Sequence, residues 1–264
     1  MSTIQIVKAN NLARQSPQGP YGSPRIVQTK TKGRILFDPN LYHKAINPPL
    51  YCDLSKPLPG QAIIVQFSGP TGAGKGDMTK LFLEEVRGSR RLTTCTTRDI
   101  REGEERDVHY KFLTEEEFDG YAAAGEFIQT NTLDTGKRYG TLRSFLIEQM
   151  NRGEILVSDI DFNGAHQMRQ KSAELPGLVL DIFLMLPGSS VEEMVKECRR
   201  RIENDGNRDR IQDRLDRIPT EVAAAADFSY TVVNDDRRRA LARILEIVTE
   251  ARVSQWRALN YTAV

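Results

Sequence analysis

Short apolar runs alternate with amphipathic segments along the chain beyond residue 60. Four of the apolar runs have the length of buried strands: 62–69, 153–161, 178–187 and 230–236. Four other segments place apolar side chains at helical spacing: 75–88, 144–153, 190–204 and 237–259. Strands that alternate with helices predict an α/β fold, in which helices flank a parallel sheet.

The composition along the chain predicts three regions. Residues 1–58 are rich in Pro and Gly, as in "RQSPQGPYGSPR", and predict a partly irregular N-terminal extension. Residues 59–250 carry the alternating pattern and form the main domain, and 251–264 predict a C-terminal helical tail. Within the main domain, the more polar stretch 91–141 predicts an inserted mixed α+β subdomain.

The net charge, the cysteine spacing and the length of the apolar runs indicate which partners and which location to expect. The formal net charge is +1, which provides no global attraction to nucleic acid or to a membrane surface. The three cysteines form no CxxC pair, and no run approaches the roughly 18 apolar residues of a membrane span. We expect a cytoplasmic protein that binds neither nucleic acid nor membranes; a homo-oligomer remains open.

A glycine-rich loop follows the first predicted strand, in the stretch "SGPTGAGKGDMTK". It matches the pattern GxxxxGK and precedes a predicted helix, which is the context that gives this pattern its meaning. Backbone N–H groups of such a loop, and the helix N-terminus, bind phosphate, while the lysine reaches the β- and γ-phosphates. We therefore expect an ATP site at Gly69, Thr71, Gly72, Ala73, Gly74, Lys75, Gly76 and Asp77.

Gly76 departs from the usual form of this loop, which has Ser or Thr after the lysine. That hydroxyl normally ligates Mg²⁺. Magnesium is bound largely by substrate phosphates and water, so one missing hydroxyl weakens the site without abolishing it. Mg²⁺ with ATP remains the expected cofactor.

A second set of motifs follows the loop in a fixed order. Its members are Thr96-Thr97-Arg98, Arg101, Gly103-Glu104, Tyr110, Tyr139-Gly140-Thr141, Asp159-Ile160-Asp161 and Val233 to Asp236. Read with the loop, this ordered set resembles the guanylate kinase family from about residue 61 to residue 247. The resemblance implies a P-loop parallel sheet with an acceptor-binding subdomain, at about 91–141, and a helical lid, at about 190–222.

The resemblance also assigns roles to individual residues. Planar guanidinium forks and neutral phenol donors suit a dianionic phosphate, and the family places two of each at the acceptor phosphate. Asp159 would hold a magnesium-bound water, and Asn234 would contact ATP. The implied catalytic residues are Lys75, Arg98, Arg214 and Asp159, and the implied phosphate clamp is Arg98, Arg101, Tyr110 and Tyr139.

The base pocket and the lid depart from the family pattern. In the family a Ser or Thr, a Glu and an Asp read guanine; here Thr94 and Asp161 match, but Gln129 replaces the Glu. Gln can accept only one of the two guanine donors that Glu accepts, which leaves the choice of purine open. Thr141 and Asp159 complete the predicted acceptor site of nine residues. The arginine turn of the lid is replaced by Asp-Gly-Asn, and the lid candidates are Arg199, Arg201, Arg208 and Arg210.

The sequence therefore predicts an ATP-dependent nucleoside monophosphate kinase that acts on GMP or dGMP. Two alternatives remain at this point. One is a non-catalytic guanylate-kinase-like binding module, in which Gly76 and Gln129 would be tolerated. The other is a kinase of a different purine monophosphate or of another small phosphate acceptor.

Overall fold

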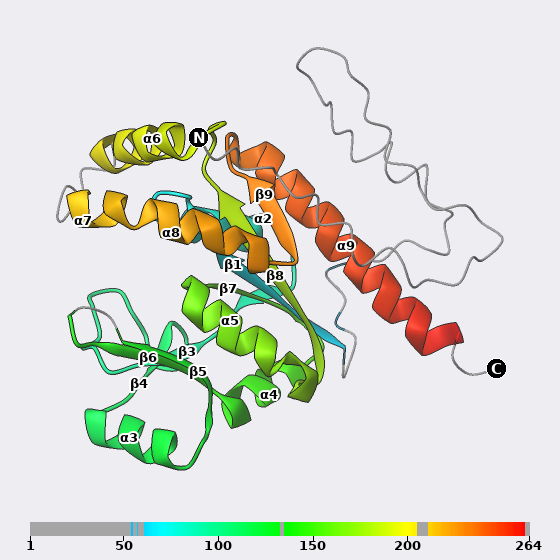
Figure 1. Ribbon diagram of the computed structural model, residues 1–264. Helices are drawn as coiled ribbons and strands as arrows, with labels where there is room; N and C mark the ends of the chain where they lie inside the picture. The colour runs from blue at the N-terminus through cyan, green and yellow to red at the C-terminus, as the bar shows by residue number, and fades with distance from the viewer. Residues whose placement is uncertain (1–53, 55–56, 58–60, 133–134, 205–210, 262–264) are drawn as a thin grey trace. The chain divides into compact units, whose positions relative to one another are not determined.

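The computed structural model describes residues 54, 57, 61–132, 135–204 and 211–261, with side chains through residue 255 (Figure 1). All of them belong to the unit Cys52–Val264. The prediction for residues 1–58 therefore lies outside the described residues, apart from Leu54 and Pro57. In the described part of the chain, no helix is both long and apolar enough to cross a membrane.

Five strands of the described region form a parallel sheet in the order β2-β7-β1-β8-β9 (Figure 1). They are β1 (Ala62–Ser68), β2 (Ser89–Arg91), β7 (Ile155–Asp159), β8 (Gly177–Met185) and β9 (Tyr230–Val233). Four of the five coincide with the predicted apolar runs, and the parallel α/β class is confirmed. The short polar β2 gave no signal in the sequence, because its residues Ser-Arg-Arg carry neither an apolar run nor an alternation.

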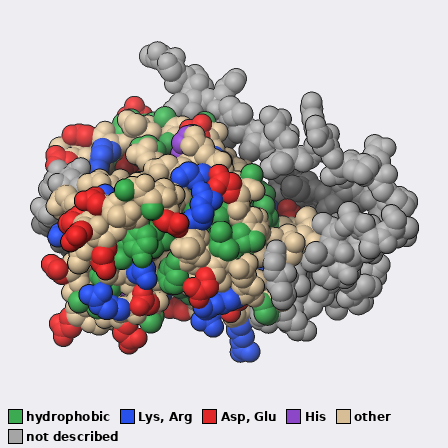
Figure 2. All heavy atoms as spheres, turned by 90° about the horizontal axis from the view of Figure 1, so that it is seen from below, with side chains coloured by type: hydrophobic (Ala, Val, Ile, Leu, Met, Phe, Trp, Pro, Cys, Tyr) green, Lys and Arg blue, Asp and Glu red, His purple; other side chains and the backbone are tan. Residues whose placement is uncertain are grey.

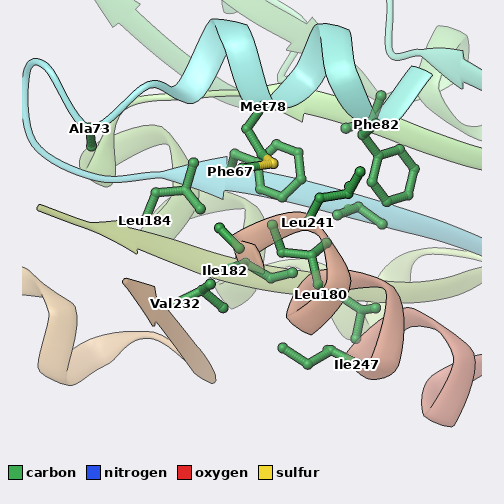
Figure 3. Close-up of a cluster of buried hydrophobic side chains, with 14 of the residues drawn as sticks. Phe67, Ala73, Met78, Phe82, Leu180, Ile182, Leu184, Val232, Leu241 and Ile247 are labelled. Carbon is green, nitrogen blue, oxygen red and sulfur yellow. The ribbon is translucent and has the colours of Figure 1, made fainter. Parts of the chain in front are cut away.

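Helices cover both faces of this sheet. Helices α2 (Lys75–Glu85) and α9 (Arg237–Tyr261) pack on one face, while α4 (Arg143–Asn151) and α5 (Phe162–Gln170) pack on the other. Successive side chains of β1 point to opposite faces of the sheet. Val65 and Phe67 therefore pack in the first cluster, with α2 and α9, and Ile64 packs in the second cluster, with α4 and α5. Figure 3 shows the first cluster, where side chains of α2 and α9 meet those of the strands.

Four further strands of the described residues form a second, mixed sheet in the order β4-β3-β6-β5. They are β3 (Thr94–Thr96), β4 (Tyr110–Phe112), β5 (Phe127–Thr132) and β6 (Arg138–Leu142), accompanied by α3 (Glu115–Ala123). The pair β3/β4 is parallel, and the pairs β3/β6 and β5/β6 are antiparallel. Thr114 and Glu117 form a capping box at the start of α3, which fixes where that helix begins.

Three helices lie in the range predicted for the lid: α6 (Val191–Asn204), α7 (Ile211–Asp216) and α8 (Ile218–Ala223). Their apolar side chains, among them Ile202, Leu215 and Ile218, join the same cluster as α2 and α9. Short 3₁₀ turns, η2 (Ser172–Glu174) and η3 (Ala224–Asp227), complete the connections. The predicted boundary between residues 250 and 251 falls inside α9, which continues to Tyr261.

The surface mixes charges of both signs. On the face shown in Figure 2, acidic and basic side chains are interspersed, with small hydrophobic patches between them. This distribution agrees with the near-balance of 37 basic and 36 acidic residues along the whole chain.

Candidate active site

The glycine-rich loop connects β1 to α2 at the carboxyl end of the central strand. Gly74 caps α2 in the left-handed conformation, with φ of 83°. A β-carbon at Gly69 would lie 2.3 Å from the carbonyl oxygen of Leu184, so no larger residue fits there. The glycines thus let the loop curve tightly at the start of a helix, which is the arrangement that binds phosphate.

Lys75 folds back over the loop. Its Nζ donates to the carbonyl oxygens of Gly69 at 2.7 Å and Pro70 at 3.1 Å. Burial lowers the pKa of Lys75, while the carboxylates of Glu221 and Asp159 act in the opposite direction. The loop therefore carries an ammonium group that is poorly hydrated and close to the place where phosphates would bind.

Helix α6 fastens the loop from one side. The Cys198 Sγ donates to the carbonyl oxygen of Thr71 at 3.0 Å, and burial raises the pKa of this thiol to about 11, which keeps it protonated. Arg201 donates Nη1 to the carbonyl oxygen of Gly72 at 3.2 Å and Nη2 to that of Asn234 at 2.8 Å. The predicted lid residue Arg201 thus holds the loop backbone in the described structure.

Two more side chains fasten the loop from other elements. The Thr71 N–H donates to Glu221 Oε2 of α8 at 3.0 Å, across 150 positions in sequence. Asn234, which follows β9, donates from Nδ2 to the carbonyl oxygen of Ala73 at 2.7 Å. Loop peptides held in place by four side chains from three parts of the chain need little reorganisation when phosphate binds.

A cavity of about 810 Å³ opens in front of the loop. Arg214 and Arg201 line it, whereas Arg199 donates to Gln212 and is not among the lining residues. Arg208 and Arg210 lie outside the described residues. The lining consists of Thr71, Gly72, Gly74, Lys75, Gly76, Asp77, Asp159, Arg200, Arg201, Ile202, Asn204, Arg214, Asn234, Asp235, Asp236 and Arg237. Seven of the nine residues predicted to bind ATP thus line this cavity, and the other two, Gly69 and Ala73, do not.

A second cavity, of about 300 Å³, lies between the two sheets. Seven of the nine residues predicted to bind the acceptor line it: Thr94, Tyr110, Gln129, Tyr139, Thr141, Asp159 and Asp161. Apolar side chains of Leu92, Ile160 and Met168 complete the lining with Asn131 and Ser158. A cavity with apolar walls and convergent polar groups suits a planar base with polar edges.

Arg98 lies beside the tyrosines of this cavity. Its guanidinium carbon is 4.9 Å from the centre of the Tyr110 ring, which in turn stands edge-on to Tyr139 at 6.0 Å. Glu104 holds the guanidinium through two hydrogen bonds, of 2.7 and 2.5 Å, which raise the pKa of Arg98 and lower that of Glu104 to about 2. Arg101 is exposed and is not among the lining residues.

Polar side chains that line this cavity are paired with one another. Gln129 donates from Nε2 to Thr141 Oγ1 at 2.9 Å, and both side chains are buried. Asn131 donates from Nδ2 to Asp161 Oδ2 at 2.8 Å. The other oxygen of Asp161 accepts from the backbone at the start of α5, so this residue also caps a helix.

Asp159 joins the two cavities, because its side chain lines both. The carboxylate accepts a 2.5 Å hydrogen bond from Arg91 Nη2 at the end of β2. Among the described residues, no group of three His, Cys, Asp or Glu side chains is arranged to hold a metal ion by itself.

Several of these residues were not predicted from the sequence. Asn131 lies two positions after Gln129 on β5, and residues two apart in a strand point to the same face. The sequence could therefore have predicted that Asn131 lies beside Gln129 in the site. Arg91 and Glu221 had no local signal, since their partners Asp159 and Thr71 are 68 and 150 positions away.

The chain is a P-loop α/β protein, because a glycine-rich phosphate loop follows the central strand of its parallel sheet and lies next to a second cavity.

Comparison with known proteins identifies the family within this class of P-loop proteins. The family model described as guanylate kinase matches residues 61–251. The guanylate kinase of Granulibacter bethesdensis is 34% identical over 205 residues, which cover 75% of this chain and 91% of that protein. The guanylate kinase of Synechococcus elongatus is 35% identical over 181 residues, covering 69% of this chain and 94% of that protein.

The chain belongs to the guanylate kinase family. The resemblance predicted from the ordered motifs is therefore confirmed. A crystal structure of guanylate kinase from Anaplasma phagocytophilum has the same fold, with a TM-score of 0.53 and 24% identity, covering 74% of this chain and 88% of that one.

Proposed function

We propose that this protein transfers the γ-phosphoryl group of ATP to GMP or dGMP, which gives ADP and GDP or dGDP. The observation that carries the proposal is the position of Asp159, whose carboxylate lines both the loop cavity and the second cavity. By the resemblance to the guanylate kinase family, we expect the loop cavity to hold the donor phosphates and the second cavity to hold the acceptor. Phosphoryl transfer needs little more from a protein than this alignment and a supply of positive charge.

The loop and Lys75 bind the donor in this proposal. The backbone N–H groups of the loop can donate to the phosphate oxygens. The partial positive charge at the N-terminus of α2 also stabilises the negative phosphates. Lys75 exchanges its bonds to Gly69 and Pro70 for bonds to phosphate oxygens. Because those carbonyls hold the ammonium only as neutral acceptors, a charged phosphate competes well for it.

Arg98, Arg101, Tyr110 and Tyr139 bind the acceptor phosphate. The hydrogen bonds of Arg98 to Glu104 and to the Asp99 carbonyl oxygen use three of the five N–H donors of its guanidinium. Glu104 thereby fixes the plane of the guanidinium, and the remaining donors can approach a phosphate with little loss of side-chain entropy. Arg101 is exposed, and it reaches the phosphate only if the segment 91–141 closes toward the loop.

A divalent ion, expected to be Mg²⁺, accompanies ATP. Oxygen donors suit this ion, and the loop cavity carries the carboxylates of Asp77, Asp159, Asp235 and Asp236. Asp159 would hold it through water, while Gly76 contributes no ligand. When bound, the ion lowers the negative charge of the transferring phosphates.

Arginines of the lid neutralise charge that develops during transfer. Arg214 lines the loop cavity and is the first candidate, and Arg201 adds its charge from the loop backbone that it holds. Arg199, Arg208 and Arg210 would join them when the range 190–222 closes over the phosphates. A cytoplasmic location and a homo-oligomer stay predictions.

The test is the formation of ADP with Mg²⁺ and a panel of GMP, dGMP, IMP, XMP, AMP, CMP and UMP. We expect turnover with GMP and dGMP and negligible turnover with CMP and UMP. The variant Lys75→Met is the control, and it should lose at least about a hundredfold in rate while its melting temperature stays close to that of the parent. Absence of turnover with every monophosphate would overturn the proposal in favour of a binding module or a different acceptor.

A further inference from the structure

The amide of Gln129 has a fixed orientation in the second cavity. Gln129 on β5 and Thr141 on β6 face each other across an antiparallel pair, and the Nε2 of Gln129 donates to Thr141 Oγ1 at 2.9 Å. Only 4% of Gln129 is exposed, so its amide group has little freedom to turn. With its NH₂ group held by a hydroxyl, the amide presents Oε1 to a ligand as an acceptor.

Room for this oxygen exists because residue 164 is glycine. A β-carbon at Gly164 would lie 2.9 Å from Gln129 Oε1 and 2.7 Å from Ile160 Cδ1. Both Gln129 and Ile160 line the cavity. The start of α5 therefore leaves space for a neutral carbonyl oxygen at the cavity wall.

Asp161 has little capacity left for a ligand. Its Oδ1 accepts from the N–H groups of Asn163 at 2.9 Å and Gly164 at 3.1 Å, and its Oδ2 accepts from Asn131 at 2.8 Å. A carboxylate offers about four lone-pair positions, so one position, on Oδ2, remains. The protein itself already compensates most of this negative charge.

The cavity thus offers a purine edge one neutral amide oxygen and one remaining carboxylate position. A 6-oxopurine donates its N1–H, and guanine adds a 2-amino group that hypoxanthine lacks. An analogue that lacks a donor is rejected strongly when it leaves a charged acceptor unpaired, and weakly when the acceptor is neutral or already bonded. Here Gln129 Oε1 is neutral, and Asp161 Oδ2 still accepts from Asn131 when hypoxanthine supplies no second donor.

We propose that this cavity accepts 6-oxopurine nucleoside monophosphates with or without the 2-amino group, and that Gln129 is the residue that sets this tolerance. The inference rests on the proposed phosphotransfer and widens its acceptor class to hypoxanthine nucleotides. Adenine is disfavoured by the same geometry, because its unprotonated N1 is itself an acceptor and would place its lone pair against those of Gln129 Oε1.

The experiment compares kcat/KM for GMP, IMP and AMP at saturating ATP and Mg²⁺, in the parent protein and in Gln129→Glu. We expect the kcat/KM of the parent to be higher for GMP than for IMP by less than about thirtyfold. In Gln129→Glu this ratio should rise by at least about tenfold, because a charge-assisted hydrogen bond is stronger than a neutral one by about that factor. AMP should be the poorest of the three. Gln170→Glu, the same change at an exposed position of α5, should leave the ratio unchanged.

Two results would overturn this inference: a preference for GMP above about thirtyfold in the parent, or an unchanged ratio in a folded Gln129→Glu. Should that variant fail to fold, the ratio in the parent decides alone. If GMP is not turned over, the proposed function fails, and calorimetric dissociation constants of GMP and IMP then decide this inference. Constants within about thirtyfold of each other support it, and a wider gap or no binding of either overturns it.

Discussion

Single residues of the site are held by side-chain partners that lie 6 to 68 positions away in sequence. Glu104 orients Arg98, Arg91 holds Asp159, and Thr141 orients Gln129. The functional residue types were predictable, because arginine forks, tyrosines and a glycine-rich loop each follow from the chemistry of phosphate. Most of their partners were not, since nothing local in the sequence relates Arg91 to Asp159, 68 positions away.

Gly76 is the residue at which the loop departs from its usual form, and a serine can be tested there. A β-carbon at this position would have no described atom within 4 Å, so Gly76→Ser fits without strain. We expect the added hydroxyl to lower the Mg²⁺ concentration that gives half-maximal rate by about threefold to tenfold, because it supplies one more oxygen ligand. A titration of activity with Mg²⁺ measures this.

An unchanged Mg²⁺ requirement in Gly76→Ser would show that the loop cavity already compensates for the missing hydroxyl. Gly120→Ser is a matched control, since position 120 in α3 is also open and lies away from both cavities.

At the scale of elements, the phosphate loop is fixed by the helices α6 and α8 and by the residue after β9, and not by its own sequence alone. The strands β1, β7, β8 and β9 and the helices α2, α4, α6 and α9 were predictable, because each carries a clear apolar period. The helices α5, α7 and α8 were not singled out, since they have only nine, six and six residues and few apolar positions. Packing maintains these helices, rather than an apolar period: α5 lies on the strands, and α7 and α8 lie against α6.

Glu221 tests the coupling between α8 and the loop. In Glu221→Leu the Thr71 N–H loses its acceptor, and we expect the KM for ATP to rise at least about fivefold while the KM for GMP changes by less than twofold. Glu221→Gln keeps an acceptor oxygen and should stay within about twofold of the parent for both substrates. Steady-state kinetics with each substrate varied in turn provide the measurement.

Equal damage by the two changes at Glu221 would contradict this account of the loop. It would indicate that the negative charge near Lys75, rather than the hydrogen bond, is what matters.

At the scale of the whole molecule, a buried arginine joins the last helix to the main sheet. Arg252 on α9 is fully buried and donates from Nη1 to the carbonyl oxygen of Gln61 at 2.6 Å and from Nη2 to that of Gly153 at 3.3 Å. The predicted helical tail from residue 251 is the end of α9, which crosses that boundary, and Arg252 on it anchors the start of β1.

Arg252→Met should lower the free energy of unfolding by about 2 kcal/mol or more, because it leaves buried carbonyl oxygens without donors. For a domain of this size that corresponds to a fall in melting temperature of about 4–8 °C. Arg243→Ala, on the exposed side of the same helix, should change stability by less than about 0.5 kcal/mol. Thermal unfolding of the two variants, followed by circular dichroism, would give the comparison, and similar effects of both would refute the anchoring role.

The central claim is that the loop cavity and the second cavity, which meet at Asp159, align two nucleotides for direct phosphoryl transfer. The most direct test follows the γ-phosphoryl group itself, with ATP labelled at that position, GMP and Mg²⁺, and separates the products by anion-exchange chromatography. The account predicts that the label appears in the β-position of GDP in equal amount to the ADP formed. Label found only in inorganic phosphate, or remaining in ATP, would contradict it.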